Sequence, residues 1–210
     1  MLTGRTYTHL NSASDAIGAT ALPFVVMITT THIVTNALVA LKKSGGATEV
    51  RESSAAKWFV AGGLAPDIGL YALSAGAAVF FPLTRGMSFQ ESMEHAFNDL
   101  FFNDRAWVAI HNTFHSPVVL AALAAAGKLS DKDGLLAFAA GCFVHTAMDI
   151  PVHHNDGPLV FFPLDWETRF DSPVSYYDRD HYGGFVAPID FAITILGGAA
   201  VARSWWKSRR

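Results

Sequence analysis

The residues best suited to chemistry in this sequence are histidines and aspartates that interrupt apolar stretches. They are His32, Asp67, His111, His115, His145 and Asp149. Two pairs, His111/His115 and His145/Asp149, are four residues apart, so on a helix each pair lies on one face. Imidazole with carboxylate suits zinc, iron or manganese, and two imidazoles with one carboxylate are typical of hydrolytic zinc. We therefore expect a divalent metal site, with zinc favoured, whose first-choice ligands are His32, Asp67, His115, His145 and Asp149.

The stretch H-T-A-M-D-I-P-V-H-H-N-D, which begins at His145, is the densest cluster of these residue types. His145, Asp149 and His153 recur every four residues, which adds His153 to the predicted metal ligands. Pro151 lies between them and is expected to interrupt the helix, because proline has no amide hydrogen to donate.

A hydrolytic metal site also needs a group that accepts a proton from the attacking water. A bound metal ion lowers the pKa of its water toward about 7 and polarises a phosphoryl or carbonyl oxygen. A carboxylate that does not ligate the metal can then act as the general base. The candidate catalytic residues are Asp67 and Asp156.

The segments that must position these residues are apolar and mostly near the length of a membrane-spanning helix. Hydrophobic residues make up 51% of the chain and charged residues only 16%, against about 25% charged in a typical soluble domain. A spanning helix needs about 20 apolar residues. The apolar segments are 16–41, 58–83, 106–127, 134–150 and 185–203. We predict an all-α fold: a polytopic transmembrane helical bundle of about five spans, with residues 1–210 forming a single membrane-embedded helical domain.

The positive charges between these segments are unevenly distributed. With five spans and the N-terminus outside, ten Lys and Arg residues fall on the inner side and five on the outer side. This asymmetry follows the positive-inside rule. It predicts a multi-pass protein of the bacterial inner (plasma) membrane with a cytoplasmic C-terminus. A soluble all-α domain with buried helices is the alternative.

Two other features of the chain bear on its class. The residues before Asp15 are polar with Arg5 as their one basic residue, so we do not expect a signal peptide. The net charge is −3, which leaves no basic excess for neutralising phosphates and argues against nucleic acid as a partner.

The ionisable residues of four predicted spans lie at similar depth. Counted from the inner boundary at about 1.5 Å per residue, they fall within a slab about 9 Å thick. Ionisable residues inside a spanning helix are costly and mark functional sites. We therefore expect them to share one site.

Two long connections join the predicted spans. Met and Phe recur with roughly helical spacing in 84–105, which indicates an amphipathic helix at the membrane interface. The segment 151–184 is expected to be a long ordered loop, and loops of this length are usually functional. Its residues Tyr176, Tyr177, Asp178 and His181 are expected to fold back over the bundle.

Several motifs in these segments resemble a known family. They are T-H at His32, A-P-D at Asp67, H-N-T-F-H-S-P from His111, H-T-A-M-D from His145, and the later F-D-S-P-V-S-Y-Y-D-R-D-H-Y-G. Together they look like the membrane-bound metal-dependent hydrolases, a group distantly similar to zinc-dependent phospholipase C. The resemblance covers residues from about 30 to 185. It implies an all-α bundle in the inner membrane and a metal-dependent hydrolase activity.

The favoured function is hydrolysis of a lipid-like phosphoester, with membrane lipid as the expected partner. The alternative is a non-catalytic membrane subunit or assembly factor that keeps the fold and binds other membrane proteins. Two departures from the resembled family motivate this alternative. Many members have an acid where this chain has Gly69, and one bacterial branch has a histidine where it has Pro158. Haem binding is a third hypothesis, which the aspartates argue against because haem iron prefers other ligands.

Overall fold

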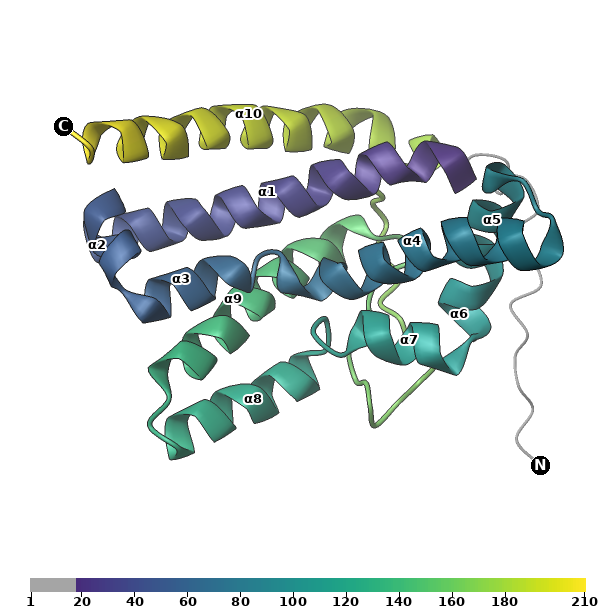
Figure 1. Cartoon of the computed structure of the whole chain (residues 1–210), viewed down its shortest axis with the longest axis horizontal. Helices are drawn as coiled ribbons and strands as arrows, with labels where there is room; N and C mark the ends of the chain where they lie inside the picture. The colour runs from purple at the N-terminus through teal and green to yellow at the C-terminus, as the bar shows by residue number, and fades with distance from the viewer. Residues whose placement is uncertain (1–17) are drawn as a thin grey trace.

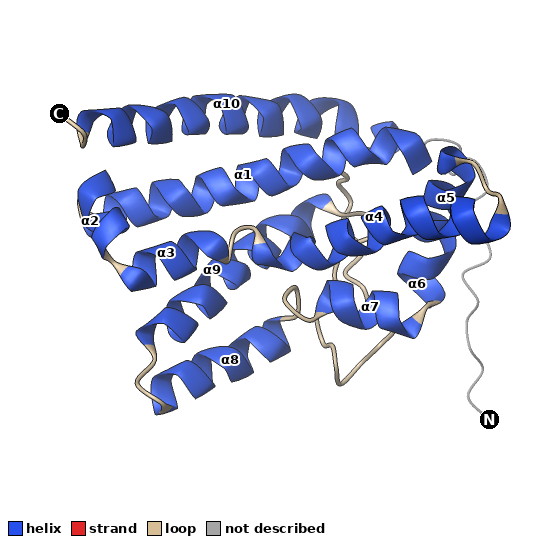
Figure 2. Cartoon of the chain, in the orientation of Figure 1, coloured by secondary structure: helices blue, strands red, loops and turns tan. Residues whose placement is uncertain are grey.

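The computed structural model describes residues 18–210, with side chains described from residue 28 onward. The chain is 74% helical, and the described residues form no β-strand, which confirms the all-α class (Figure 2). The α-helices are α1 (Gly18–Ser44), α2 (Ala47–Glu52), α3 (Ser54–Ala61), α4 (Ala65–Arg85), α5 (Phe89–His95), α6 (Phe101–Asn103), α7 (Arg105–Asn112), α8 (Pro117–Leu129), α9 (Asp133–Asp149) and α10 (Gly183–Lys207). The shorter turns are the π-helix η1 (Ala96–Leu100) and the 3-10 helices η2 (Ile150–Val152) and η3 (Arg179–His181). Arg5 and Asp15 lie outside the described residues.

Helices α1 and α9 each pack against several other helices. Helix α10 runs along α1, while α3 and α8 both pack against α9 (Figure 1). Asn36 of α1 joins three of these helices, because its side-chain amide donates to Phe59 O at 3.0 Å and to Gly141 O at 3.1 Å. These two bonds tie α1 to α3 and α9 in the interior.

Within the described part of the chain, three helical segments are long and apolar enough to cross a membrane. They are α4, α9 extended through η2, and α10. Helices α7 and α8 meet the same criterion together, although they are bent by 50° relative to each other. Large apolar side chains on these helices are exposed, including Phe80, Leu83, Phe143, Ile189 and Leu196. Such a surface is compatible with a membrane protein; the predicted count of five spans is not confirmed.

Two segments predicted as single spans are broken in the structure. The first, 58–83, divides at residues 62–64 into α3 and α4. Pro66 lies in the first turn of α4, where its missing amide hydrogen costs nothing, so it begins this helix instead of kinking one. The second, 106–127, divides into α7 and α8, and the Ser116 hydroxyl accepts from Val118 N and Val119 N to cap α8.

The connection 84–105 is helical, as predicted, but it consists of three short helical pieces. A capping box of Ser88 and Glu91 begins α5. Met93, Phe97 and Phe101 are buried in one core cluster with residues of α4. The apolar side of this segment therefore packs inward; its location at a membrane interface stays a prediction.

Glycines let α9 approach the break between α3 and α4 closely. A Cβ atom on Gly62 would lie 2.6 Å from Cys142 N and 2.6 Å from Phe138 O. A Cβ atom on Gly141 would overlap Phe59 O. Any larger side chain at these positions would push the helices apart, so the glycines bring the end of α9 to the broken helix.

Candidate metal centre

The structure brings together five buried polar side chains from four parts of the bundle. They are His32 of α1, Asp67 of α4, His115 from the turn between α7 and α8, and His145 and Asp149 of α9. The least buried of them, Asp67, is 7% exposed. They are the five residues predicted from the sequence as first-choice metal ligands. Two overlapping groups among them could hold a metal ion: His32/His145/Asp149 and Asp67/His115/His145.

Two ring nitrogens and two carboxylate oxygens of the centre lie close to one another. His115 Nε2 lies 3.4 Å from Asp67 Oδ1 and 3.5 Å from Asp149 Oδ2. His145 Nε2 lies 3.6 Å and 3.0 Å from the same two oxygens. A tetrahedral zinc ion with bonds of about 2.0–2.1 Å separates its ligand atoms by about 3.3–3.4 Å. These four nitrogen–oxygen distances therefore fall within a few tenths of an ångström of that separation.

Backbone carbonyls orient two of the imidazoles. His145 Nδ1 lies 3.0 Å from Gly63 O, and His115 Nδ1 lies 2.6 Å from His111 O. A carbonyl only accepts, so each Nδ1 carries the proton and each Nε2 presents a lone pair to the centre. An imidazole that ligates a metal usually donates its other ring nitrogen in this way.

Asp67 is held from the side opposite the imidazoles. The Thr29 hydroxyl donates to Asp67 Oδ2, and the Tyr71 hydroxyl donates to Thr29 Oγ1 at 2.7 Å. This chain occupies Oδ2 and leaves Oδ1 directed at His115 and His145. The carboxylate is therefore positioned before any ion binds.

Several buried polar atoms of the centre have no hydrogen-bond partner. They include both ring nitrogens of His32, and Nε2 of His145. His32 Nε2 is only 2.8 Å from Asp149 Oδ1, but this contact lacks the geometry of a hydrogen bond. Buried unpaired polar groups are rare because each costs about 1–3 kcal/mol. A cation among these atoms would take the lone pair of His145 Nε2 and of one ring nitrogen of His32, so the donor set fits a metal ion.

His153 and Asp156 lie beside this group but in neither of its two candidate ligand sets. His153 Nε2 is 3.6 Å from Asp149 Oδ1, and its Nδ1 is 3.1 Å from Asp156 Oδ1. Burial lowers the pKa of His153, but the carboxylates of Asp156 and Asp149 outweigh it and raise that pKa to about 10. As predicted, regular helix ends before Pro151, and a turn of 3-10 helix still carries His153 back to Asp149.

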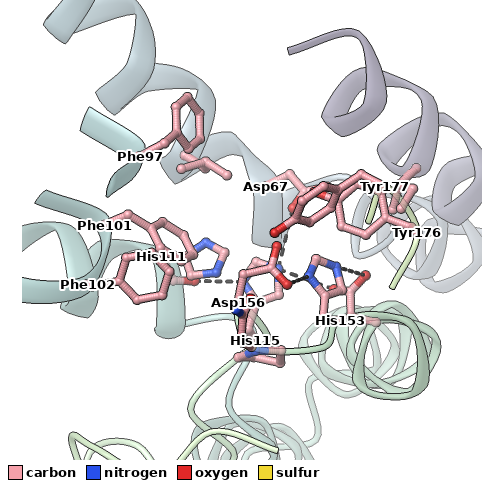
Figure 3. A pocket seen from close by; sticks show the side chains of 15 residues that line it. Asp67, Phe97, Phe101, Phe102, His111, His115, His153, Asp156, Tyr176 and Tyr177 are labelled. Atoms are coloured by element: carbon pink, nitrogen blue, oxygen red, sulfur yellow. Dashed lines mark hydrogen bonds and ion pairs between the residues drawn. The ribbon is translucent and has the colours of Figure 1, made fainter. Parts of the chain in front are cut away.

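A pocket opens directly onto the centre. It has a cavity volume of about 70 Å³, which is room for several waters or a small charged group, since one water needs about 10–15 Å³. Asp67, His115 and Asp149 line it, together with His153 and Asp156. In Figure 3, Asp156 lies near the middle of the pocket, between His111 on one side and His153 on the other.

Aromatic side chains form much of the remaining wall. They are Phe97, Phe101, Phe102, Tyr176 and Tyr177 (Figure 3). Burial raises the pKa of both tyrosines, so they are neutral phenols able to donate hydrogen bonds. The pocket therefore has ionisable side chains, including Asp67, Asp149 and Asp156, at one side and aromatic rings at the other.

The late loop folds back over the bundle, as predicted. Tyr176 N donates to Val152 O at 2.8 Å, and the Tyr176 ring lies 4.7 Å from that of His153. His181 contacts Asp178 at 2.8 Å and stacks on His154, with ring centroids 3.6 Å apart. Nearly parallel rings cannot direct their lone pairs at one shared ion, so these two histidines do not form a second chelating pair.

Part of this site is not predicted from the sequence. His111 shares a helix face with His115 but is not among the predicted ligands; its ring lies between those of His115 and Phe101, and its Nδ1 is buried without a hydrogen-bond partner. The phenylalanines of the wall were interpreted only as an amphipathic helix. Their helical spacing was visible, but their direction toward the metal-binding residues depends on how α4 and α5 pack.

No protein-family model, curated protein or solved structure matches this chain. The fold and the site define an all-helical protein with helices able to span a membrane and a buried His/Asp cluster that could bind a metal ion.

Proposed function

We propose that the protein is a zinc-dependent hydrolase of the bacterial inner membrane that acts on a lipid-like phosphoester. The observation that carries the proposal is the close set of Asp67, His115, His145 and Asp149, with nitrogen–oxygen distances of 3.0–3.6 Å. Asp67, His115 and Asp149 of this set line a pocket. On this proposal the chain belongs with the membrane-bound metal-dependent hydrolases, spans the membrane several times and has a cytoplasmic C-terminus.

The donor set favours zinc among divalent ions. Two imidazoles and two carboxylates suit zinc, whereas magnesium and calcium prefer six or more oxygens. When bound, the ion would supply an activated water and polarise a phosphoryl oxygen. His115 and His145 are fixed for this role by their backbone carbonyls.

Asp156 is the better candidate for the general base. Asp67 presents Oδ1 to the imidazoles and accepts from Thr29 through Oδ2, so both of its oxygens are engaged. Asp156 lines the pocket outside both candidate ligand groups. Its carboxylate is therefore placed to take a proton from a water at the pocket floor.

The wall of the pocket favours a substrate with an apolar part. Phe97, Phe101 and Phe102 offer a surface for an acyl chain or another apolar group, while the floor would bind an anionic oxygen. The exposed apolar faces of helices long enough to cross a membrane support a substrate that is met in a bilayer. Membrane lipid is the natural source of such a molecule.

The test is metal analysis and hydrolysis with the full chain in detergent. We expect bound zinc in the purified protein and release of product from a fluorogenic phosphodiester with an acyl chain. Asp156→Asn should abolish turnover and keep the metal, whereas Asp99→Asn, a change at an exposed carboxylate, should alter neither. Bound metal without hydrolysis of any phosphoester would support the non-catalytic membrane subunit, and absence of metal would refute the hydrolase.

A further inference from the structure

The carboxylate of Asp156 depends on the backbone of its turn for its direction. Asp156 Oδ1 lies 3.1 Å from His153 Nδ1, but among the described residues neither atom has a hydrogen-bond partner. The backbone directly after Asp156 is better anchored, because the buried Gly157 carbonyl accepts a hydrogen bond from Arg169 Nη1. Whatever holds Arg169 in place therefore also holds the turn that carries Asp156.

Arg169 connects this turn to the aromatic wall of the pocket. Its guanidinium carbon lies 5.1 Å from the ring centroid of Phe101 and 5.2 Å from that of Phe102. Both distances are within the range of about 6 Å over which an aromatic ring attracts a cation. The two phenylalanines line the pocket, whereas Arg169 is not among the described residues that do so. One side chain thus contacts the wall and the turn from outside the cavity.

The guanidinium group suits both contacts at once. It is planar, carries five donors in a rigid fork and stacks on aromatic faces. A hydrogen bond from a charged donor is also stronger than one between neutral groups. The backbone of Arg169 lies beside that of Leu159 in an antiparallel bridge, so the side chain starts from a defined position. A lysine ammonium is a compact point charge and would not reproduce both contacts.

We infer that Arg169 is a positioning residue that fixes the turn of Asp156 relative to Phe101 and Phe102. Figure 3 shows the two rings and the Asp156 side chain around one pocket. The consequence for catalysis rests on the proposed function: the rings receive the apolar part of the substrate, and Asp156 takes a proton from the attacking water. Their separation must then match the substrate, and Arg169 sets it without touching the substrate.

The first measurement does not require activity. The one cysteine of the chain, Cys142, is buried, so spin labels can be directed to Asn155→Cys and Asp99→Cys in the full-length protein in detergent. These exposed positions lie next to Asp156 and on the helical segment of the wall. Electron paramagnetic resonance should give a narrow distribution of distances between the labels, and Arg169→Ala should broaden it.

Two further variants separate this role from general stability. Arg105→Ala is the matched control, because the Arg105 guanidinium lies over a different ring, that of Trp166, at 4.6 Å. It should leave the distribution narrow. Arg169→Lys keeps the charge and loses the planar fork, so it should also broaden the distribution, and it provides the test if Arg169→Ala does not fold.

The second measurement is turnover of the phosphodiester with an acyl chain. Arg169→Ala should retain zinc and lower kcat about 10- to 100-fold, since a displacement of about 1 Å can cost about 100-fold. Added guanidinium ions should restore part of that rate, which they would not do for a variant that is merely unstable. Arg105→Ala should keep the wild-type kcat.

The two measurements distinguish the inference from the proposed function. An unchanged distance distribution in Arg169→Ala, equal broadening in Arg105→Ala, or wild-type kcat in an active Arg169→Ala variant would each overturn the inference. Broadening confined to the Arg169 variants in a protein that hydrolyses no phosphoester would leave the positioning role standing and refute the proposed function alone.

Discussion

His145 Nδ1 donates to the backbone carbonyl of Gly63 across 3.0 Å, and this bond exists because a helix is broken there. In an unbroken helix Gly63 O would accept from Asp67 N. Asp67 N instead bonds Leu64 O at 3.2 Å, which leaves the Gly63 carbonyl for the imidazole. The break that begins α4 therefore also orients a candidate metal ligand of α9.

The second broken segment repeats this arrangement. His115 N bonds Asn112 O at 3.2 Å instead of His111 O, and His111 O is taken by the His115 ring. Irregular backbone is tolerated within a membrane only where protein or a cavity surrounds it. Asp67, which follows the first break, and His115, within the second, line the same pocket. The lost backbone hydrogen bonds at each break therefore accompany the positioning of a candidate ligand.

The first prediction compares one substitution at His145 with one at Asp149, its partner four residues later on α9. His145→Ala removes an imidazole that lies between Asp67 and Asp149, so both buried carboxylates lose a partner. We expect loss of bound metal and destabilisation of about 3 kcal/mol. Asp149→Asn keeps the side-chain shape and should lose metal with a smaller destabilisation. Metal analysis measures the loss of bound metal, and the thermal midpoint in detergent measures the destabilisation. Unchanged metal content in both variants would contradict the proposed metal site.

The second prediction concerns the close approach of α9 to the broken helix. Gly62→Ala places a methyl group 2.6 Å from two backbone atoms of α9, so the helix must move away and His145 with it. We expect a lower thermal midpoint and reduced metal content, although residue 62 is no ligand. Gly76→Ala, where nothing lies within 4 Å, is the control. Equal metal content in the two variants would show that the contact does not position the site.

The third prediction is the membrane topology. Lys42 and Lys43 lie in the last turn of α1, and Lys207 is the last residue of α10. The positive-inside rule places these helix ends in the cytoplasm. Reporters fused after Lys43 and after Arg210 should read cytoplasmic, and one inserted at Gly86 should read external. Recovery of the protein in the soluble fraction without detergent would refute this arrangement.

The fourth prediction is a pH dependence of the late loop. Burial raises the pKa of Asp178, but hydrogen bonds from His181 and from Asp180 N outweigh it, so the pKa is lowered from 3.8. A lowered folded-state pKa adds stability above pH 3.8, which is lost as the pH falls through the folded-state value. The wild type should therefore unfold at higher temperature than Asp178→Asn at pH 7. That difference should shrink only below pH 3.8, as tryptophan fluorescence would show; a constant difference would contradict it.

The sequence by itself determined which five polar side chains form the buried cluster. The i,i+4 spacing of His145 and Asp149 is a local helical property, and polar groups in apolar helices have few low-energy alternatives to pairing with one another. Counting residues along the apolar segments likewise predicted that His32 and Asp67 lie at a similar depth in the bundle. The return of His153 to Asp149 was readable from the same four-residue repeat, although Pro151 interrupts it.

Only the tertiary structure decided where the helices break and how the imidazoles point. Hydropathy makes 58–83 look continuous, and Pro66 is equally compatible with a kink and with a helix start. The choice depends on α9, because the glycine contact at Gly62 and the bond from His145 to Gly63 come from a segment some 80 residues away. Local patterns report local energies, whereas these contacts form only when α3, α4 and α9 pack together.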